Sequence, residues 1–249
     1  MPKLSDLKVK LFTDGADKAQ ILDMAKQPWI RGFTTNPSLL KKAGVADYEA
    51  YARDVVAAVP DRHISFEVFS DDIPEMVAQG RVIASWGKNV FVKLPVTNTR
   101  GERLFEAVRT LSREGVNINM TAIFTSEQVA RAVDALAGGA PACVSVFAGR
   151  LADFGIDYRP IMRDAVARAR RTPNVEIIWA STREAFNVVE ADEMGCHIIT
   201  APADILKKLP AFGSKSEADL SLDAVKAFRT DAIAANLSLK LAPRADAAE

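Results

Sequence analysis

Eight short runs with the character of β-strands recur along this chain, and segments with helical periodicity separate them. The helical segments repeat their apolar residues about every 3.6 positions, as in SEQVARAVDALA and PIMRDAVARARR. Strict alternation of strand and helix implies parallel strands, and eight such units most simply close into an α/β barrel of the (β/α)8 type, a TIM barrel. The predicted strands cover residues 8–15, 30–37, 63–69, 89–96, 115–124, 141–148, 175–181 and 197–202.

The length of the chain suits one such barrel. It has 249 residues, of which 49% are hydrophobic and 26% charged, so a sizeable core is expected and bulk disorder is not. No linker rich in Gly, Pro or Ser divides it, and we expect a single domain over residues 1–249. Beyond the eighth unit, SEADLSLDAVKAFRTDAIAANL predicts an extra C-terminal helix over about residues 218–237, followed by a frayed tail. We expect a homo-oligomer, and whether this helix covers its own barrel or reaches a neighbouring subunit is open.

The charge balance and the cysteine count narrow the class of protein. Lys plus Arg and Asp plus Glu number 32 each, which gives no electrostatic case for nucleic acid or an anionic membrane as partner. Two cysteines, Cys143 and Cys196, cannot form a disulfide framework and indicate a reducing compartment. The start, MPKLSDLKVKLF, lacks the apolar region of a signal peptide, and no run of 18 apolar residues occurs. We therefore expect a cytoplasmic protein.

Strand parity predicts where polar side chains gather. Side chains alternate between the lumen and the helix-facing side, and in TIM barrels activity lies at the carboxyl ends of the strands. In the fifth strand Asn117, Asn119 and Thr121 share one face, opposite an apolar face that suits packing against helices. The polar face therefore points into the lumen. The same test places Ser65, Glu67 and Lys93 in the lumen, and Asp14, Asn36, Ser145 and Ser181 at or near carboxyl ends.

Lys93 is the least expected of these residues, because the run NVFVKLPVT otherwise has the pattern of a buried strand. A lysine is rarely buried unless it is paired or used in chemistry. For a single Asn or Ser, a hydrated barrel mouth is the better explanation. Lys93 and Glu67 together are harder to explain in that way, since two buried ionisable groups are costly unless paired or functional. We therefore predict a catalytic role for Lys93.

Several other chemistries lack the residues they need. The only histidines, His63 and His197, open their strands and so belong at the bottom of the barrel, where a structural role is expected. With no histidine near Ser145, Ser181 or Cys143, a histidine-activated nucleophile is unsupported. The cysteines lack metal-ligand spacing, so no metal site is predicted. Neither a G-x-G-x-x-G nor a G-x-x-x-x-G-K-[ST] motif is present, which argues against a nucleotide-binding fold.

Amine catalysis remains. Desolvation in an apolar lumen favours the neutral form of a lysine side chain, which can attack a carbonyl and form a Schiff base. The iminium then serves as an electron sink for making or breaking a neighbouring C–C bond. Such a mechanism needs proton shuttles, and Asp14, Glu67 and Thr121 are the candidates.

Two arginines suggest an anionic substrate. SVFAGR and WASTR place Arg150 and Arg183 just beyond the sixth and seventh strands. The loops after the late strands are the usual phosphate site of such barrels, and arginine binds phosphate bidentately. Each arginine alone would suit the protein surface, but two of them beside lumen serines favour a sugar-phosphate site.

The motifs FTTNPSLL, VFVKLPVT, NMTAIFT, SVFAGRLAD and IITAPADILKKL follow one another along the chain, one per strand. In this order they resemble the transaldolase family, and the resemblance runs from LFTDGAD to LSLDAVKAF, nearly the whole chain. It implies a (β/α)8 class I aldolase that needs no cofactor and whose Schiff-base lysine lies on the fourth strand, where Lys93 stands.

The resemblance also implies roles for the other residues. Asp14 would take and return the proton of the sugar hydroxyl, and Glu67 and Thr121 would hold the water that shuttles protons. A dihydroxyacetone unit would pass from fructose 6-phosphate or sedoheptulose 7-phosphate to glyceraldehyde 3-phosphate or erythrose 4-phosphate. The substrate-binding residues would be Asn36 and Asn119 for the dihydroxyacetone hydroxyls, Ser145 in the donor site, Arg150, Ser181 and Arg183 for the phosphate, and also Phe147.

Two positions separate the alternatives within this family. The related fructose 6-phosphate aldolases, which release free dihydroxyacetone, carry Gln in place of Glu67 and Tyr in place of Phe147. Phenylalanine cannot donate a proton to the enamine, so we expect transfer to exceed release.

The chain also departs from the family pattern. The family's usual phosphate motif Ser-Phe-Arg-Asn is Ser-Thr-Arg-Glu here, and Glu184 would place a negative charge beside the phosphate. TNTRGERLF also departs from the short-chain pattern. A related ketose, another anionic group, and a barrel that binds sugar phosphates without turnover stay open.

Overall fold

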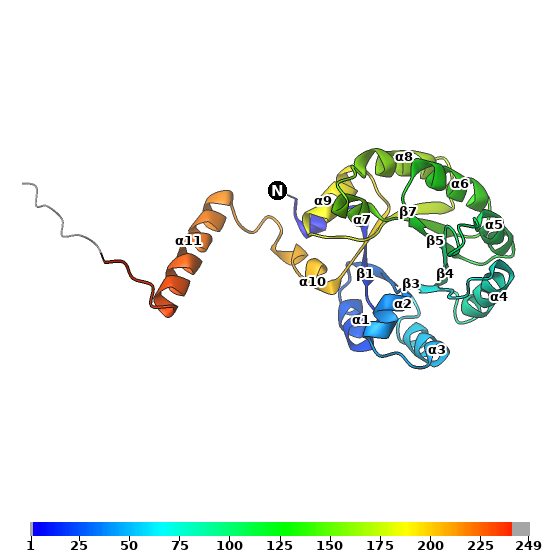
Figure 1. Cartoon of the computed structure of the whole chain (residues 1–249), viewed down its shortest axis with the longest axis horizontal. Coiled ribbons are helices and arrows are strands. Elements are labelled where there is room, and N and C mark those ends of the chain that lie inside the picture. Colours follow the sequence, from blue (N-terminus) through cyan, green and yellow to red (C-terminus); the bar gives the residue numbers. More distant parts are fainter. Residues whose placement is uncertain (1, 241–249) are drawn as a thin grey trace, which may run out of the picture.

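Eight parallel strands hydrogen-bond to one another in chain order, and the last pairs with the first, so the sheet closes into a barrel with the helices outside it (Figure 1). The structure is a computed structural model, and it describes residues 2–240. The predicted (β/α)8 barrel is confirmed, and each strand lies within its predicted range. The strands are β1 (Lys10–Asp14), β2 (Ile30–Thr34), β3 (His63–Glu67), β4 (Val90–Pro95), β5 (Ile118–Ile123), β6 (Ala142–Val146), β7 (Val175–Trp179) and β8 (Ile198–Ala201).

Helices begin where a side-chain oxygen can cap the first turn. Asp17, Asp47 and Asp72 precede three of the helices, and each accepts a hydrogen bond from the backbone N–H three residues further on. Three short helices, α2, α7 and α10, follow β2, β6 and β8 directly and so lie at the carboxyl ends of those strands. The helices are α1 (Lys18–Ala25), α2 (Pro37–Lys42), α3 (Tyr48–Ala58), α4 (Ile73–Ala84), α5 (Phe105–Arg113), α6 (Ser126–Leu136), α7 (Ala148–Asp153), α8 (Arg159–Ala169), α9 (Phe186–Glu193), α10 (Ala203–Leu206) and α11 (Glu217–Ala234), with 3-10 turns η1 (Leu4–Asp6) and η2 (Leu209–Ala211).

The two faces of the strands belong to two separate apolar clusters. The helix-facing side chains, such as Val92 and Leu94 of β4, join the large cluster between the strands and the surrounding helices. Burial of each such side chain stabilises the fold by about 1.5–3 kcal/mol. A smaller cluster fills the lumen itself, with Phe12, Ile178 and Ile198 among its members. The alternation predicted from parity is therefore present on both faces.

Aromatic rings close the base of the lumen. The ring of His63, the first residue of β3, stacks on Phe91 with centroids 3.6 Å apart and meets Phe12 edge-on at 4.7 Å. Gly32 on β2 makes room for this arrangement, because a Cβ atom there would lie 2.6 Å from the Phe12 ring. His197 directly precedes β8. Both histidines thus stand at the amino ends of strands, where the sequence predicted them.

The C-terminal helix α11 lies apart from the barrel (Figure 1). It was expected over residues 218–237 and is observed at Glu217–Ala234, with Ser216 as its cap. No residue of this helix is buried, and five large apolar side chains are more than half exposed. They are Leu220, Leu222, Val225, Phe228 and Ile233. The tail predicted to fray beyond it falls partly on residues 241–249, which lie outside the described residues.

Within residues 2–240 no helix combines the length and the hydropathy needed to span a membrane.

Candidate functional site

A cavity of about 200 Å³ opens at the carboxyl ends of the strands. Nine of the eleven residues predicted for the site line it, and Glu67 and Asn119 lie just outside its lining. The nine come from the ends of β1, β4, β5 and β6 and from the segments after β2, β6 and β7. They are Asp14, Asn36, Lys93, Thr121, Ser145, Phe147, Arg150, Ser181 and Arg183.

Lys93 is buried, with 7% of its surface exposed, and its ammonium is held by two oxygen atoms. Its Nζ lies 3.1 Å from Oε2 of Glu67 and donates a hydrogen bond of 3.0 Å to the backbone carbonyl of Thr35. Glu67 and Lys93 are direct partners in the register between β3 and β4, so the pairing of the two strands brings the two side chains together. A buried charge needs such a partner, and a carboxylate at this distance can also accept the proton of the amine.

Glu67 is positioned through its backbone as well as its side chain. Its carbonyl accepts a hydrogen bond of 2.9 Å from the hydroxyl of Tyr48 on α3. Its side chain lines a second hollow, on the side of α2 and α3, together with Leu40 and Phe69. Glu67 therefore stands between this hollow and the amine of Lys93.

Asp14, at the end of β1, accepts a hydrogen bond of 2.7 Å from the hydroxyl of Thr34. The Thr34 hydroxyl also lies 2.6 Å from that of Thr200, so β1, β2 and β8 are joined at this level. Burial raises the pKa of Asp14, while the positive charge of Lys93 and the Thr34 hydrogen bond act in the opposite direction. A carboxyl group whose pKa is raised towards neutrality is suited to proton transfer.

Thr34, Thr35 and Thr200 were missed as parts of the site. Thr34 and Thr200 line the cavity, and the Thr35 carbonyl contacts Lys93. Parity applied to IRGFTTNP and HIITAP would have indicated Thr34 and Thr200, since each lies near the carboxyl end of its strand, two residues beyond another lumen position. No side-chain pattern marks the Thr35 carbonyl, because a backbone contact leaves no trace in residue type.

Asn119 reaches the cavity only through a neighbour. Its Nδ2 donates to Ser65 Oγ at 3.0 Å, and its Oδ1 accepts from Ser145 Oγ at 2.7 Å. Thr121, two residues along β5, lines the cavity, and its buried hydroxyl has no partner among the described residues. An unpartnered buried hydroxyl costs about 1–3 kcal/mol, so this position suits a hydrogen bond to a ligand or a water molecule. Asn117 lies before β5 and bonds the carbonyl of Lys88, well below the cavity.

The predicted anion corner is built from α7 and the segment after β7. Arg150 places its guanidinium 5.1 Å from the centre of the Phe147 ring, and both residues line the cavity. Ser181 has a left-handed backbone, with φ of 66°. Its carbonyl approaches Gly149 so closely that a Cβ atom at Gly149 would lie 1.6 Å from the oxygen. Glycine is therefore required where α7 meets this segment.

The second arginine of this corner is held by an ion pair, since Nε of Arg183 donates to Asp153 Oδ1 at 3.1 Å. The charge of Arg183 is thus partly balanced before any ligand binds. Glu184, which we expected beside the anion, is exposed and does not line the cavity, although its neighbour Arg183 does. It follows Arg183 on the way to α9.

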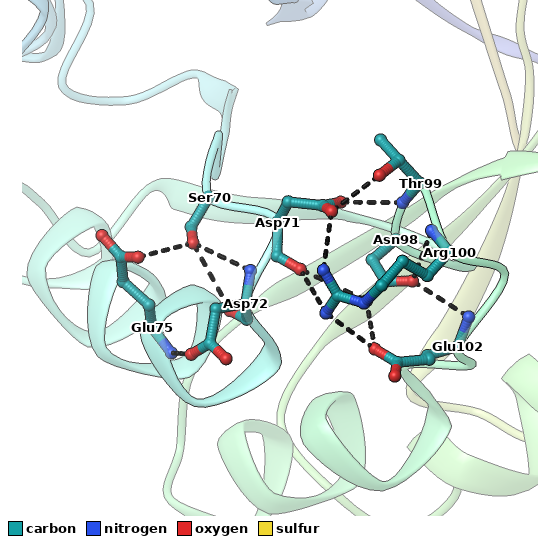
Figure 2. A network of polar contacts seen from close by, with 8 residues as sticks. All are labelled: Ser70, Asp71, Asp72, Glu75, Asn98, Thr99, Arg100 and Glu102. Carbon is teal, nitrogen blue, oxygen red and sulfur yellow. Dashed lines mark hydrogen bonds and ion pairs between the residues drawn. The ribbon is translucent and has the colours of Figure 1, made fainter.

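The ends of β3 and β4 are tied together by a polar network (Figure 2). The carboxylate of Asp71 accepts from the backbone N–H and the hydroxyl of Thr99, at 2.7 and 2.6 Å, and from Arg100 at 3.0 Å. The segment TNTRGERLF forms a hairpin turn that makes these contacts. Because β3 carries Glu67 and β4 carries Lys93, this network stabilises the part of the rim above the ion pair.

Fold and cavity together define a (β/α)8 barrel with a buried lysine–carboxylate pair at its mouth. A family profile described as Transaldolase/Fructose-6-phosphate aldolase matches residues 11–243. The chain is 36% identical over 202 residues to "Probable transaldolase" of Dehalococcoides mccartyi, covering 81% of this chain and 90% of that one. It is 38% identical over 205 residues to "Probable transaldolase" of Clostridium acetobutylicum, covering 81% and 89%. The chain therefore belongs to the transaldolase/fructose-6-phosphate aldolase family, whose members are enzymes of the aldolase/transaldolase type.

Among solved structures, the chain is similar to 2,3-dimethylmalate lyase of the PEP mutase/isocitrate lyase superfamily. The TM-score is 0.52 at 15% identity, over 97% of this chain and 89% of that one. At this identity the likeness shows the barrel fold alone.

Proposed function

We propose that this protein is a transaldolase, which transfers a dihydroxyacetone unit from a ketose phosphate to an aldose phosphate through a Schiff base on Lys93. The observation that carries the proposal is the buried amine of Lys93, which lines the cavity and lies 3.1 Å from the Glu67 carboxylate. Sugar phosphates are the substrates that the family suggests. Fructose 6-phosphate and sedoheptulose 7-phosphate would be donors, and glyceraldehyde 3-phosphate and erythrose 4-phosphate acceptors, as in the non-oxidative pentose phosphate pathway.

The first half of the reaction forms the imine. Glu67 accepts a proton from the Lys93 ammonium, and the neutral amine attacks the ketone carbon of the donor. The resulting carbinolamine loses its hydroxyl group as water, with Glu67 and Thr121 holding the water that carries the protons. The unpartnered Thr121 hydroxyl supports this role. No cofactor is required, because the iminium itself serves as the electron sink.

The second half breaks one C–C bond and forms another. Asp14 takes the proton of the hydroxyl next to the cleaved bond, the bond electrons pass to the iminium, and the aldose phosphate leaves. The three-carbon enamine then attacks the carbonyl carbon of the acceptor, and Asp14 returns the proton to the new alkoxide. Water hydrolyses the iminium and releases Lys93. The raised pKa of Asp14 supports its use as both base and acid.

The remaining lining residues would bind the substrate. Asn36 and Ser145 would contact hydroxyls of the dihydroxyacetone unit, and Asn119 would act on the same group through Ser145. Asn36 also caps α2, since its Oδ1 accepts from the Leu39 N–H at 3.0 Å, so its amide nitrogen is left to donate to the substrate. The phosphate would lie between Arg150, Ser181 and Arg183.

The competing activity within the family is release of free dihydroxyacetone. Phe147 and Glu67 both favour transfer, since Phe147 has no hydroxyl to protonate the enamine. The test is to measure turnover of fructose 6-phosphate and release of free dihydroxyacetone with and without erythrose 4-phosphate, because transfer to this acceptor gives a different ketose, sedoheptulose 7-phosphate. We expect turnover to depend on the acceptor. Release without acceptor at the rate of transfer would establish the aldolase reaction instead.

The identity of the anion can be tested in the same assay. A panel of ketoses that differ only in the terminal group, phosphate or another anion, should show the lowest KM for phosphate if two arginines bind it. A lower KM for a different anion would move the proposal to a related ketose.

We further propose a cytoplasmic homo-oligomer with no nucleic-acid partner. The homo-oligomer is supported by α11, whose large apolar side chains are exposed in the single chain. Sedimentation of the full chain and of a chain ending at Gly213 tests this. We expect the full chain to form an oligomer and the shortened chain to form an assembly with fewer subunits. A monomeric full chain would refute the proposed homo-oligomer.

A further inference from the structure

A chain of hydrogen bonds runs through the lumen from its base to the cavity. Nε2 of His63 lies 2.9 Å from Ser65 Oγ. Ser65 Oγ lies 3.0 Å from Asn119 Nδ2, and Asn119 Oδ1 lies 2.7 Å from Ser145 Oγ. The chain therefore joins β3, β5 and β6, and it connects a histidine at the amino end of one strand with a residue that lines the cavity.

The middle of this chain is closed to solvent. Ser65 and Asn119 are fully buried, and Ser145 is 2% exposed. In such a place each polar hydrogen must find an acceptor within the protein, so the direction of one bond determines the direction of the next. The direction can be followed from donor to acceptor along the four side chains.

The amide of Asn119 sets the roles of its two neighbours. Its Nδ2 donates to Ser65 Oγ, so the proton of Ser65 is free to point the other way, to Nε2 of His63. With the Ser65 proton in this direction, that nitrogen is unprotonated and the proton of the neutral ring is on Nδ1. At the other end, Ser145 donates its proton to Asn119 Oδ1 and therefore presents only lone pairs to the cavity.

We propose that His63 is a positioning residue that acts on the substrate through Ser65, Asn119 and Ser145. In its Nδ1–H tautomer it makes Ser145 a hydrogen-bond acceptor, which selects a hydroxyl group of the donor sugar. The opposite tautomer would reverse every bond at the same distances between heavy atoms, and Ser145 would then be a donor. The identity of the bound group as a sugar hydroxyl rests on the proposed function, whereas the tautomer does not.

The surroundings of His63 hold the ring in one orientation. It stacks on Phe91, with an angle of 10° between the planes, and meets the edge of Phe12. Burial, with a smaller contribution from the positive charge of Lys10, lowers the pKa of His63 to about 3. The ring is thus neutral at ordinary pH and has one donor and one acceptor nitrogen, as the chain of hydrogen bonds requires.

The tautomer can be measured directly by ¹⁵N NMR on the full chain labelled at histidine. Only His63 and His197 contribute, and the variant His63→Phe assigns the signals. His197 is an internal control, because its Nδ1 accepts from the Ile177 N–H at 3.2 Å and its proton must be on Nε2. We expect the two histidines to be opposite tautomers. A proton on Nε2 of His63 would overturn the proposal whether or not the protein is a transaldolase.

Kinetics test the link to the substrate. His63→Phe keeps an aromatic ring between its neighbours but loses the acceptor, and we expect the donor KM to rise about tenfold with kcat changed less than about threefold. Ser65→Ala should do the same, and the double variant should be no worse than the worse single variant, because the two residues act through one path. His197→Phe should leave the donor KM unchanged.

Two outcomes of the kinetic experiment would contradict the proposal. An unchanged donor KM in His63→Phe would show that the ring does not act on the substrate. Losses that add in the double variant would show that His63 and Ser65 act independently. In each variant, a three-carbon adduct on Lys93 at saturating donor separates these outcomes from failure of the proposed function.

Discussion

The two ends of the lumen are lined by the same strands, yet a step of two residues along a strand changes their chemistry. On β1 the step leads from Phe12 to Asp14, and on β4 from Phe91 to Lys93. The base layer packs aromatic and aliphatic side chains against one another. The upper layer holds an ion pair and a carboxyl group that burial disfavours in its charged form. We infer that the base contributes more to the stability of the barrel than the mouth, whose polar groups we propose for catalysis.

The largest effect is expected at the mouth, from Lys93→Arg. Arginine keeps a positive charge beside Glu67 but has no nucleophilic amine, so transfer should fall at least about 10⁴-fold while the protein stays folded. Turnover of fructose 6-phosphate with acceptor measures the loss, and circular dichroism checks the fold. Residual transfer above about 1% of the wild-type rate would contradict the assignment of Lys93 as nucleophile.

The corresponding change at the base is Phe12→Ala. The Phe12 ring is 2% exposed, and its removal should lower the free energy of unfolding by about 3–5 kcal/mol through lost burial and a residual cavity. Urea unfolding measures the change. A loss below about 1 kcal/mol would show that the base layer does not provide the stability that the comparison assigns to it.

A third change separates stability from activity within the mouth. The pKa of Asp14 is raised in the folded protein, so its contribution to stability is fully present only below the ordinary carboxyl value and is lost as pH rises through the folded value. Because asparagine does not ionise, Asp14→Asn removes this loss of stability at high pH. We expect its Tm to exceed that of the wild type by about 2–4 °C at pH 8, with the difference shrinking towards pH 4. Transfer should be abolished.

The melting curves of Asp14→Asn and the wild type over that pH range provide the check. A variant that is less stable than the wild type at pH 8 would mean that the contacts of Asp14 with Thr34 and Lys93 outweigh its burial.

The smallest effect is expected from Phe147→Tyr. The new hydroxyl can protonate the enamine, so release of dihydroxyacetone relative to transfer should rise about threefold. The ratio of the two rates in the acceptor assay measures it, with Phe124→Tyr as a matched control, because Phe124 packs beside Phe147 but does not line the cavity. If the ratio stays the same in Phe147→Tyr, the proton-donor explanation for this position fails.

Strand periodicity was sufficient to predict the barrel, because eight separate alternations each indicated the same parallel architecture. Parity also predicted which side chains face the lumen, as for Lys93 and Glu67. It could not predict which atoms meet across strands, since that depends on stagger and on bulges, such as the one after Met120 that places Ala122 at φ of 59°. The hydrogen bond between Ser65 on β3 and Asn119 on β5 is one such contact that parity could not predict.

The C-terminal helix shows another limit. The run SEADLSLDAVKAFRTDAIAANL predicted the helix to within a few residues, but a local sequence pattern carries no information about what such a helix packs against. Arg183 is similar. Its position after β7 was predicted, whereas its ion pair with Asp153 joins residues 30 apart in sequence and depends on how α7 packs.

The central claim is that Lys93 forms a covalent intermediate with a ketose phosphate. Borohydride reduction in the presence of fructose 6-phosphate, followed by peptide mass mapping, tests it most directly. We predict a reduced three-carbon adduct on Lys93 and none in Lys93→Arg. No adduct, as for a barrel that binds sugar phosphates without turnover, or an adduct on a different lysine, would contradict the account.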